Sequence, residues 1–435
     1  MSKAAFYTLG CKVNQYETEA MSELFSKAGY EICNFDSYAD VYVINTCTVT
    51  AMSDRKSRQI IRRAKKHNPN SVVIVTGCYA QTNPEAVAKI SGVNLILGTN
   101  DRKKIVELCQ SIKPTEQLCN VGDIMKLHDF EDMAITDYHE RTRAYIKIQE
   151  GCNQFCSYCI IPYARGPIRS RDIDDVISET EILVKNGYTE VIYTGIHVAS
   201  YGLDKGGAKL SELLCRADKI EGLKRIRLSS IEPMTLNSDF IKSIEPCKKL
   251  CHHFHLSLQS GCDETLKRMN RHYTTGLYLE KCGILRQYFD RPALTTDVIV
   301  GFPGETEEEF AQTERFLETV HFSDMHIFKY SKRRGTKAAD MPNQIDPQIQ
   351  SVRSEKLIAL GERMKDDFLE ACKDQEQIVL IEEETEIDGT KYMTGHSKNY
   401  IRCAFEMDGL VPNMVIKGTI NSKLNEEFVF CKRID

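Results

Sequence analysis

The sequence lacks long apolar runs and an apolar leader. No stretch approaches the roughly 18 consecutive apolar residues that a membrane-spanning helix requires, and its longest apolar runs resemble the strand-like segment 72–75. The first residues lead directly into a strand-like segment, so we expect no secretory signal. Fixed-period repeats and low-complexity tracts are also missing, and a composition of 42% hydrophobic and 27% charged residues is typical of a globular chain.

An excess of positive charge is missing as well. The 57 lysines and arginines are outnumbered by 62 acidic residues, for a net charge of −5, which argues against a globally basic nucleic-acid binder but allows a local basic patch. Cysteine, in contrast, is abundant, with 17 residues. A chain of this length can bury a hydrophobic core large enough to fold without stabilising disulfides. We therefore expect reduced thiols, some of them metal ligands, in a cytoplasmic protein without membrane attachment.

The length of 435 residues suggests roughly three domains. The first, 1–125, alternates helix-like stretches with short β-rich runs, which predicts a doubly wound parallel sheet with strands at 4–9, 41–46, 72–76 and 93–97. Residues 111–140 lack this alternation and are rich in acidic residues, which predicts a linker.

A second α/β domain is predicted at 138–370. Six strand candidates separated by helices predict a partial (β/α)6 barrel, with strands at 144–149, 190–194, 224–229, 253–258, 294–300 and 325–330. A long helix follows at 347–374. The last domain, 371–435, shows short strands with turns at 388–389 and 408–409, which predicts a small all-β barrel.

A CxxxCxxC motif follows the first strand of the predicted barrel, with Cys152, Cys156 and Cys159. Chance and a structural zinc site are alternatives, although no fourth cysteine or histidine lies within the next 30 residues. Three thiolates can hold three irons of a 4Fe–4S cluster and leave the fourth iron open. Such an iron can bind the amino and carboxylate groups of S-adenosylmethionine, and reductive cleavage then yields a carbon radical.

Polar residues on two predicted barrel strands form a matching pocket. Strand alternation places His255, Ser257 and Gln259 on one face, and Asp297 shares a face with Gly301. We expect these faces to point into the barrel, although each polar residue alone is as readily structural. Glycines at strand ends, at 195 and 301, allow close approach of a ligand and also simply make turns.

A second cysteine set is spread along the first domain. Cys11, Cys47 and Cys78 each follow a predicted strand, and parallel strands end at the same edge of a sheet, where doubly wound folds bind ligands. The alternative is three unrelated buried thiols. The repeated placement favours a second three-thiolate cluster.

One helical segment, 55–66, holds seven basic residues and no acidic one. A solvated helix face is the ordinary explanation, but the missing acids and the nearby Cys47 favour phosphate binding. The predicted RNA contacts are Arg58, Arg62, Arg63, Lys65 and, beyond the segment, Arg165.

Across nearly its whole length, the chain resembles the radical S-adenosylmethionine methylthiotransferases. The resemblance is carried by the segments 8–14, 45–49, 76–78, 151–159, 161–166, 229–233, 258–261 and 301–305. It implies an auxiliary 4Fe–4S cluster on Cys11, Cys47 and Cys78, a radical cluster on Cys152, Cys156 and Cys159, and a C-terminal barrel of the TRAM type. It also implies that Tyr158 contacts the adenine of S-adenosylmethionine and that further pocket residues are Gly195, Glu232, Gln259, Asp297 and Gly301.

The residues after the first cysteine, Lys12-Val13-Asn14, look like the branch that acts on N6-threonylcarbamoyladenosine in tRNA. This implies methylthiolation of carbon 2 of the adenine 3′ to the anticodon, with two S-adenosylmethionine molecules and a tRNA anticodon stem-loop as substrate. One molecule methylates sulfur carried on the auxiliary cluster, and the other generates the 5′-deoxyadenosyl radical. The implied electron donor is a flavodoxin or ferredoxin, and the sulfur donor is left open.

Three alternatives stay open. The enzyme could act on isopentenyladenosine in tRNA, where the branch has Gln-Met-Asn after the first cysteine, or on an aspartate of a ribosomal protein, where the branch has Pro-Lys-Asn. A non-catalytic iron–sulfur electron carrier would keep the cysteines but would not need the polar pocket.

Overall fold

The computed structural model describes residues 1–136, 142–207 and 209–434, and begins with a six-stranded parallel sheet. The order of its strands is β2-β1-β3-β4-β5-β6. They are β1 (Lys3–Thr8), β2 (Glu31–Cys33), β3 (Val41–Thr46), β4 (Val72–Gly77), β5 (Leu95–Leu97) and β6 (Leu118–Asn120). The central strands β3 and β4 are buried on both faces, which explains their runs of Val and Ile.

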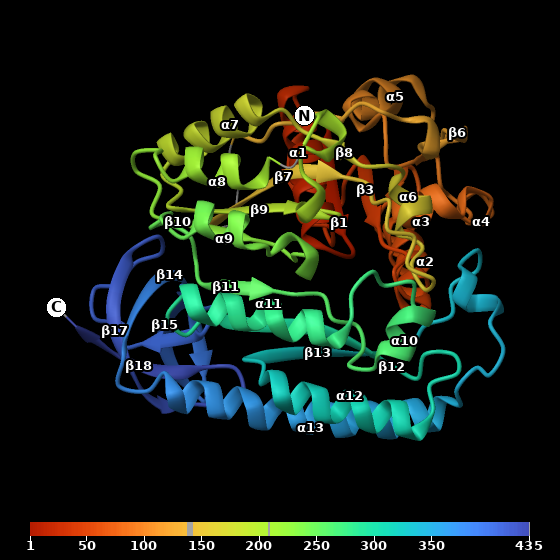
Figure 1. The fold of residues 1–435 in the computed structure, drawn as a ribbon. Coiled ribbons are helices and arrows are strands. Elements are labelled where there is room, and N and C mark those ends of the chain that lie inside the picture. Colours follow the sequence, from red (N-terminus) through yellow and green to blue (C-terminus); the bar gives the residue numbers. More distant parts are fainter. Residues whose placement is uncertain (137–141, 208, 435) are drawn as a thin grey trace.

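Helices cover both faces of this sheet (Figure 1). On one face, α1 (Lys12–Lys27) and α5 (Ile105–Ser111) bury Met21, Phe25 and Ile105 against the strands. On the other face lie α2 (Ala51–His67), α3 (Cys78–Thr82) and α4 (Pro84–Ala88). This doubly wound architecture confirms the predicted fold of the first domain. The sequence pattern missed the short edge strands β2 and β6.

Six further parallel strands form the central open barrel. They are β7 (Arg143–Glu150), β9 (Glu190–Gly195), β10 (Arg225–Leu228), β11 (His253–His255), β12 (Ala293–Val300) and β13 (Asp324–Lys329). Two hydrogen-bonded sheets, β10-β9-β7-β8 and β11-β12-β13, are joined by isolated bridges such as Ile226 to Leu250. The short strand β8 (Arg169–Ser170) pairs antiparallel with β7. All six predicted strands are therefore present, in a barrel that does not close.

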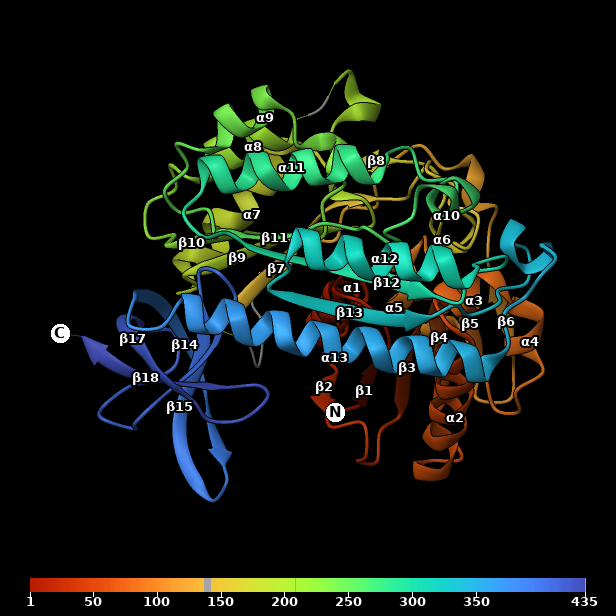
Figure 2. The same ribbon diagram turned by 60° about the horizontal axis from the view of Figure 1, so that its bottom comes forward.

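Helices surround the outside of this barrel (Figures 1 and 2). They are α7 (Ile173–Lys185), α8 (Leu210–Ala217), α9 (Ser238–Ile244), α10 (Asp263–Arg268), α11 (Thr275–Tyr288), α12 (Glu307–Val320) and α13 (Pro347–Ala371). The short helix α6 (Ile161–Arg165) lies against α3 of the first domain. Helix α12 begins with a capping box between Thr306 and Glu309. Figure 2 shows α13 running beside β13 toward the C-terminal domain.

The C-terminal domain is a closed five-stranded barrel with strand order β14-β15-β16-β18-β17. Its strands are β14 (Glu376–Ile387), β15 (Thr390–Ser397), β16 (Arg402–Phe405), β17 (Val415–Lys423) and β18 (Val429–Ile434). The predicted all-β region is thus confirmed, whereas its assignment to the TRAM type stays a prediction.

The interpretation of residues 111–140 as a linker was wrong in two places of its described part. Residues 118–120 form β6, and both Met133 and Ile135 are buried in the core of the central domain. These two apolar side chains anchor the segment, a signal too short for periodicity to detect. The predicted domain boundary at 138 lies outside the described residues.

Candidate active site

The CxxxCxxC loop follows β7 and is fixed by tight backbone packing. Gly151 has a φ of +74°, and a Cβ there would lie 1.8 Å from the carbonyl oxygen of Pro167, so only glycine fits. The amide of Cys159 donates to the carbonyl of Cys156 over 2.9 Å. The loop therefore holds its thiols at the C-terminal end of the barrel strands, where the chemistry of βα-barrels takes place.

The donor set of this loop suits a metal cluster. Burial, together with the neighbouring cysteines, raises the pKa of Cys152 to about 11 and that of Cys159 to about 12. Coordination to a metal converts such thiols to thiolates at neutral pH. Arg271 places a fixed cation beside them, since its Nη1 donates to the Sγ of Cys156 over 3.3 Å.

Arg271 was not predicted, because nothing in the sequence around it distinguishes it from a surface arginine. Its Nη2 donates to the carboxylate of Glu232, and its Nε donates to the hydroxyl of Tyr273 over 3.0 Å. Glu232 and His197 line a cavity of about 460 Å³ beside this pair. The predicted pocket residue Glu232 is thus held next to the CxxxCxxC loop by an arginine that contacts both.

Tyr158, Gln259 and Asp297, three of the predicted pocket residues, line one cavity of about 250 Å³. Cys159 also lines it, and so does Thr50 from the loop that follows Cys47 in the first domain. This cavity therefore lies between the two domains and is bordered by residues close to both cysteine sets.

Side chains fill the space beside the two predicted glycines. A Cβ on Gly301, which has a φ of +71°, would lie 2.3 Å from the Cγ of Gln350. On Gly195 it would lie 2.9 Å from the side-chain oxygen of Gln149. Their proposed contact with a cofactor stays a prediction, since it would require these glutamines to move.

The second cysteine set is brought together at the edge of the N-terminal sheet. Asn45 pairs with Thr8, and Gly77 with Thr46, so the three strands end side by side. Because the chain turns to opposite faces after β1 and β3, this edge is the switch point at which doubly wound sheets bind ligands.

The three thiols at this edge interact with one another. Burial raises the pKa of Cys11, and it raises that of Cys78 to about 12. The charges of Cys47 and Cys11 also raise the pKa of Cys78, and the charge of Cys47 raises that of Cys11, whereas Arg165 lowers both. Arg165 donates from Nε to the Sγ of Cys78 over 3.1 Å. The sheet therefore gathers three cysteines that are far apart in the sequence.

Neither cysteine set is compact enough for a single ion. In the described parts of the chain, only His255, Asp297 and His326 bring three possible ligand atoms within 4.8 Å of one another. Each thiolate of an iron–sulfur cluster holds its own iron, so its sulfurs stand farther apart than the ligands of one zinc ion. The wider spacing is consistent with clusters at both cysteine sets.

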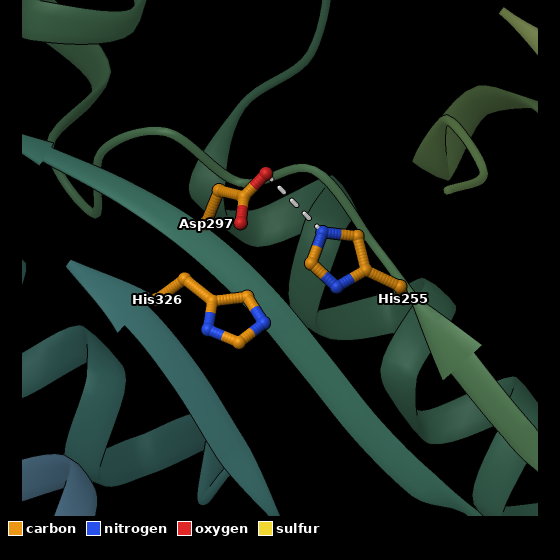
Figure 3. A group of neighbouring side chains, drawn as sticks. All are labelled: His255, Asp297 and His326. Carbon is orange, nitrogen blue, oxygen red and sulfur yellow. Dashed lines mark ion pairs between the residues drawn. The ribbon is translucent and has the colours of Figure 1, made fainter. Parts of the chain in front are cut away.

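The histidine group lies on the inner face of the barrel (Figure 3). It comes from three adjacent strands, and the Nε2 of His255 lies 3.3 Å from a carboxylate oxygen of Asp297. The hydroxyl of Thr295 bonds the Nδ1 of the same imidazole over 3.0 Å. The predicted inward direction of the 255 and 297 side chains is therefore seen in the structure.

Arg165 was predicted to contact RNA, and the structure contradicts this. Its side chain is 0% exposed and belongs to a buried ionic network between the first two domains. Its Nη1 lies 2.5 Å from Glu17 of α1 and 3.3 Å from Glu150 of β7. Arginine is usually a surface residue, so the sequence predicted an exposed side chain. In the structure, buried carboxylates from two domains pair with Arg165 instead.

The basic segment forms α2, and its cations divide into two groups. Arg62 is exposed, whereas Arg58 donates to the hydroxyl of Tyr79 over 3.2 Å. Arg63 pairs with Asp36, and the ammonium group of Lys65 bonds to backbone carbonyls. RNA contact stays a prediction for this helix, and the structure directs it toward the outward-facing positions.

A wide groove of about 910 Å³ lies close to α2. The exposed ring of Tyr163 lines it together with Lys332 and Arg334. Arg333, between these two cations, is buried and pairs with Asp54 of α2 over 2.6 Å. The groove thus combines an aromatic ring with exposed positive charge. Proteins that bind single-stranded nucleic acids use aromatic rings to stack on bases and cations to contact phosphates.

Comparison with known proteins identifies the family. Residues 3–98 match the family described as "Uncharacterized protein family UPF0004", and residues 146–317 match the radical SAM superfamily. The chain is 45% identical to the threonylcarbamoyladenosine tRNA methylthiotransferase MtaB of Bacillus subtilis, over 93% of this chain and 91% of that protein. The chain belongs to the radical S-adenosylmethionine tRNA methylthiotransferases.

One further relative of this methylthiotransferase and one solved structure of similar fold extend the comparison. It is 35% identical to the tRNA-2-methylthio-N(6)-dimethylallyladenosine synthase of Clostridium tetani, over 89% of this chain and 88% of that protein. Its fold resembles the radical S-adenosylmethionine methyltransferase TsrM of Kitasatospora setae, with a TM-score of 0.55 and 15% identity over 78% of this chain and 74% of that chain.

Family membership makes the protein an enzyme that acts on tRNA and uses S-adenosylmethionine with a 4Fe–4S cluster. In the described ranges, no helix of this methylthiotransferase is long and apolar enough to cross a membrane.

Proposed function

We propose that the enzyme adds a methylthio group to carbon 2 of N6-threonylcarbamoyladenosine, 3′ to the anticodon, using two 4Fe–4S clusters and two S-adenosylmethionine molecules. One observation supports this above all. The second cysteine set, which a simple radical enzyme does not need, lies at a sheet edge whose following loop borders the same cavity as Cys159.

Each part of the site has a distinct task in this proposal. Cys152, Cys156 and Cys159 would hold the radical cluster, which supplies the electron for cleavage of S-adenosylmethionine. Cys11, Cys47 and Cys78 would hold the auxiliary, sulfur-carrying cluster. An aromatic C–H carbon is neither nucleophilic nor easily deprotonated, so a radical route suits this substrate.

Neighbouring side chains hold the residues around the two cysteine sets in place and put positive charge beside the thiols. Arg271 holds the carboxylate of Glu232 beside the radical-cluster loop, and Arg165 donates to the thiol of Cys78. Tyr158 packs edge-on against Phe302, which fixes its ring at the wall of the cavity. We expect a flavodoxin or ferredoxin as electron donor, and because the substrate is tRNA, we expect the enzyme to act in the cytoplasm.

The cluster assignment predicts iron counts. The anaerobically reconstituted enzyme should contain about eight irons, and about four after Cys152, Cys156 and Cys159 are all replaced by alanine. Cys47→Ala should abolish the methylthio product while the radical-cluster ligands stay intact. Cys262→Ala, a buried cysteine on neither cluster, is the matched control. A triple variant that still forms 5′-deoxyadenosine would refute the assignment.

The substrate is tested by mass spectrometry of nucleosides after incubation with anticodon stem-loops. The stem-loop that contains N6-threonylcarbamoyladenosine should gain the methylthio group. A preference for isopentenyladenosine would place the enzyme with its dimethylallyladenosine relatives. Modification of an aspartate in a ribosomal protein, and of no RNA, would contradict the proposal entirely.

A further inference from the structure

A cluster of cations surrounds Tyr400 at the end of the central barrel that faces the C-terminal domain. The Tyr400 ring stacks on His253 with 4.5 Å between centroids, and the guanidinium of Arg227 lies 4.7 Å above it. Arg143 lies 5.8 Å from the same ring. Lys12, the first residue of α1, is partly buried and interacts electrostatically with Tyr400, Arg143 and Arg227, and more weakly with the carboxylate of Glu190.

The carboxylates near this cluster already have partners. Glu190 binds Arg225 at 2.6 Å and Arg227 at 3.1 Å. Glu382 binds Arg143 at 3.1 Å and accepts a hydrogen bond from His396, at 2.8 Å. The imidazole of His396 is neutral, because burial lowers its pKa to about 4.

Positive charge therefore exceeds negative charge in this cluster. Four cations face the two carboxylates of Glu190 and Glu382, and within the described residues Lys12 forms no ion pair and no hydrogen bond. The Nη1 of Arg143 is also buried without a partner. The nearby carboxylate of Asp297 is paired with His255. Because withdrawing a charge from water is costly unless it is paired, the cluster is suited to bind an anion.

The position of Lys12 indicates which anion. Lys12 directly follows Cys11, a predicted ligand of the sulfur-carrying cluster. In adenine, C2 and the carbon that bears N6 both adjoin N1, so a base with C2 toward Cys11 presents its N6 substituent along the same edge. A threonylcarbamoyl substituent ends in a carboxylate, whereas an isopentenyl group is apolar.

The cluster also adjoins open space. A cavity of about 360 Å³ is lined by Thr295, His326, His396 and Tyr400. Thr295 and Asp297 are alternate residues on the inner face of β12, and Asp297 lines the cavity beside Cys159. The inner face of one strand thus runs from the cation cluster to the radical-cluster loop.

We propose that Lys12 and Arg143 bind the carboxylate of the N6 substituent and so select threonylcarbamoyladenosine over isopentenyladenosine. This subsite rests on the proposed function and deepens it. It assigns to Lys12 the role of a specificity-determining residue.

The test compares binding of three stem-loops to the reconstituted full-length enzyme. They contain N6-threonylcarbamoyladenosine, its carboxylate methyl ester, or unmodified adenosine. Wild-type enzyme should bind the free acid about 10- to 100-fold more tightly than the ester. This ratio corresponds to the binding free energy of a hydrogen bond to a charged group. Lys12→Gln should remove most of this preference and leave the affinity for the ester unchanged, while Lys12→Arg should keep it.

Lys27→Gln is the matched control, a lysine at the exposed end of the same helix. An equal acid-to-ester ratio in wild type and Lys12→Gln would overturn the subsite. So would a loss of affinity for unmodified RNA, which would indicate a phosphate contact, or for S-adenosylmethionine, which carries its own carboxylate. If Lys12→Gln loses its iron, Lys12→Arg tests the residue, and equal binding of acid and ester by the wild type would still overturn the subsite. Absence of methylthio product from every stem-loop would count against the proposed function, whereas the binding ratio tests the subsite alone.

Discussion

Replacing Glu17 by glutamine should destabilise the protein strongly, because this carboxylate is the centre of the buried network between the first two domains. Its oxygens lie 2.6 Å from Arg102, 2.9 Å from Lys147 and 2.5 Å from Arg165. These three cations pair with the carboxylates of Glu17, Glu150 and Glu131 in the native state. Removal of Glu17 leaves one buried positive charge without compensation.

The expected loss follows from that imbalance. Breaking a buried ion pair by removing one partner costs about 3–5 kcal/mol, and glutamine keeps the volume of the side chain, so cavity formation adds little. Thermal unfolding of the reconstituted enzyme under anaerobic conditions measures the effect. The control is Glu31→Gln, whose partly exposed pair with Lys3 at 3.3 Å should be worth less than about 1 kcal/mol. Equal small effects of both substitutions would refute the idea that this network holds the domains together.

Three further predictions concern Glu17, Gly151 and α2. Burial alone would raise the pKa of Glu17, but the three surrounding cations hold it well below 4.5, so its contribution to stability is complete above about pH 4.5 and is lost as the pH falls through the folded value. The wild type should therefore lose more thermal stability than Glu17→Gln on acidification, measured as melting temperature against pH. Gly151→Ala should lower the iron content from about eight to about four, because its Cβ would lie 1.8 Å from a carbonyl oxygen; an unchanged count would contradict the loop geometry. Replacing both exposed residues Arg62 and Lys66 by alanine should weaken tRNA binding and reduce the salt dependence of the affinity by about one per residue. Lys65→Ala should not have this effect, because the ammonium group of Lys65 bonds to backbone carbonyls. Binding isotherms at several salt concentrations measure the slopes, and equal slopes would mean that α2 does not contact RNA.

The sequence alone determined the strands and the cysteine sets. Buried parallel strands are short apolar runs, so β3 and β4 could be located from their Val and Ile residues. The six barrel strands could be located as strand-like segments that alternate with helices. Because parallel strands end at one edge, Cys11, Cys47 and Cys78 could be placed together without knowing the fold. The edge strands β2 and β6 escaped prediction, since each has only three residues and no distinctive pattern.

Only the tertiary structure decided what the charged residues do. Arg165 and Arg62 look alike in the sequence, yet one is buried among Glu17 and Glu150 and the other faces solvent. Lys12 interacts electrostatically with Tyr400, which lies near the other end of the sequence. The physical reason is that local periodicity reports which face of an element is apolar, whereas the partner of a charge is set by which distant elements pack against that face. The cysteines could be located from the sequence, whereas the charges that surround them depend on how the three domains pack against one another.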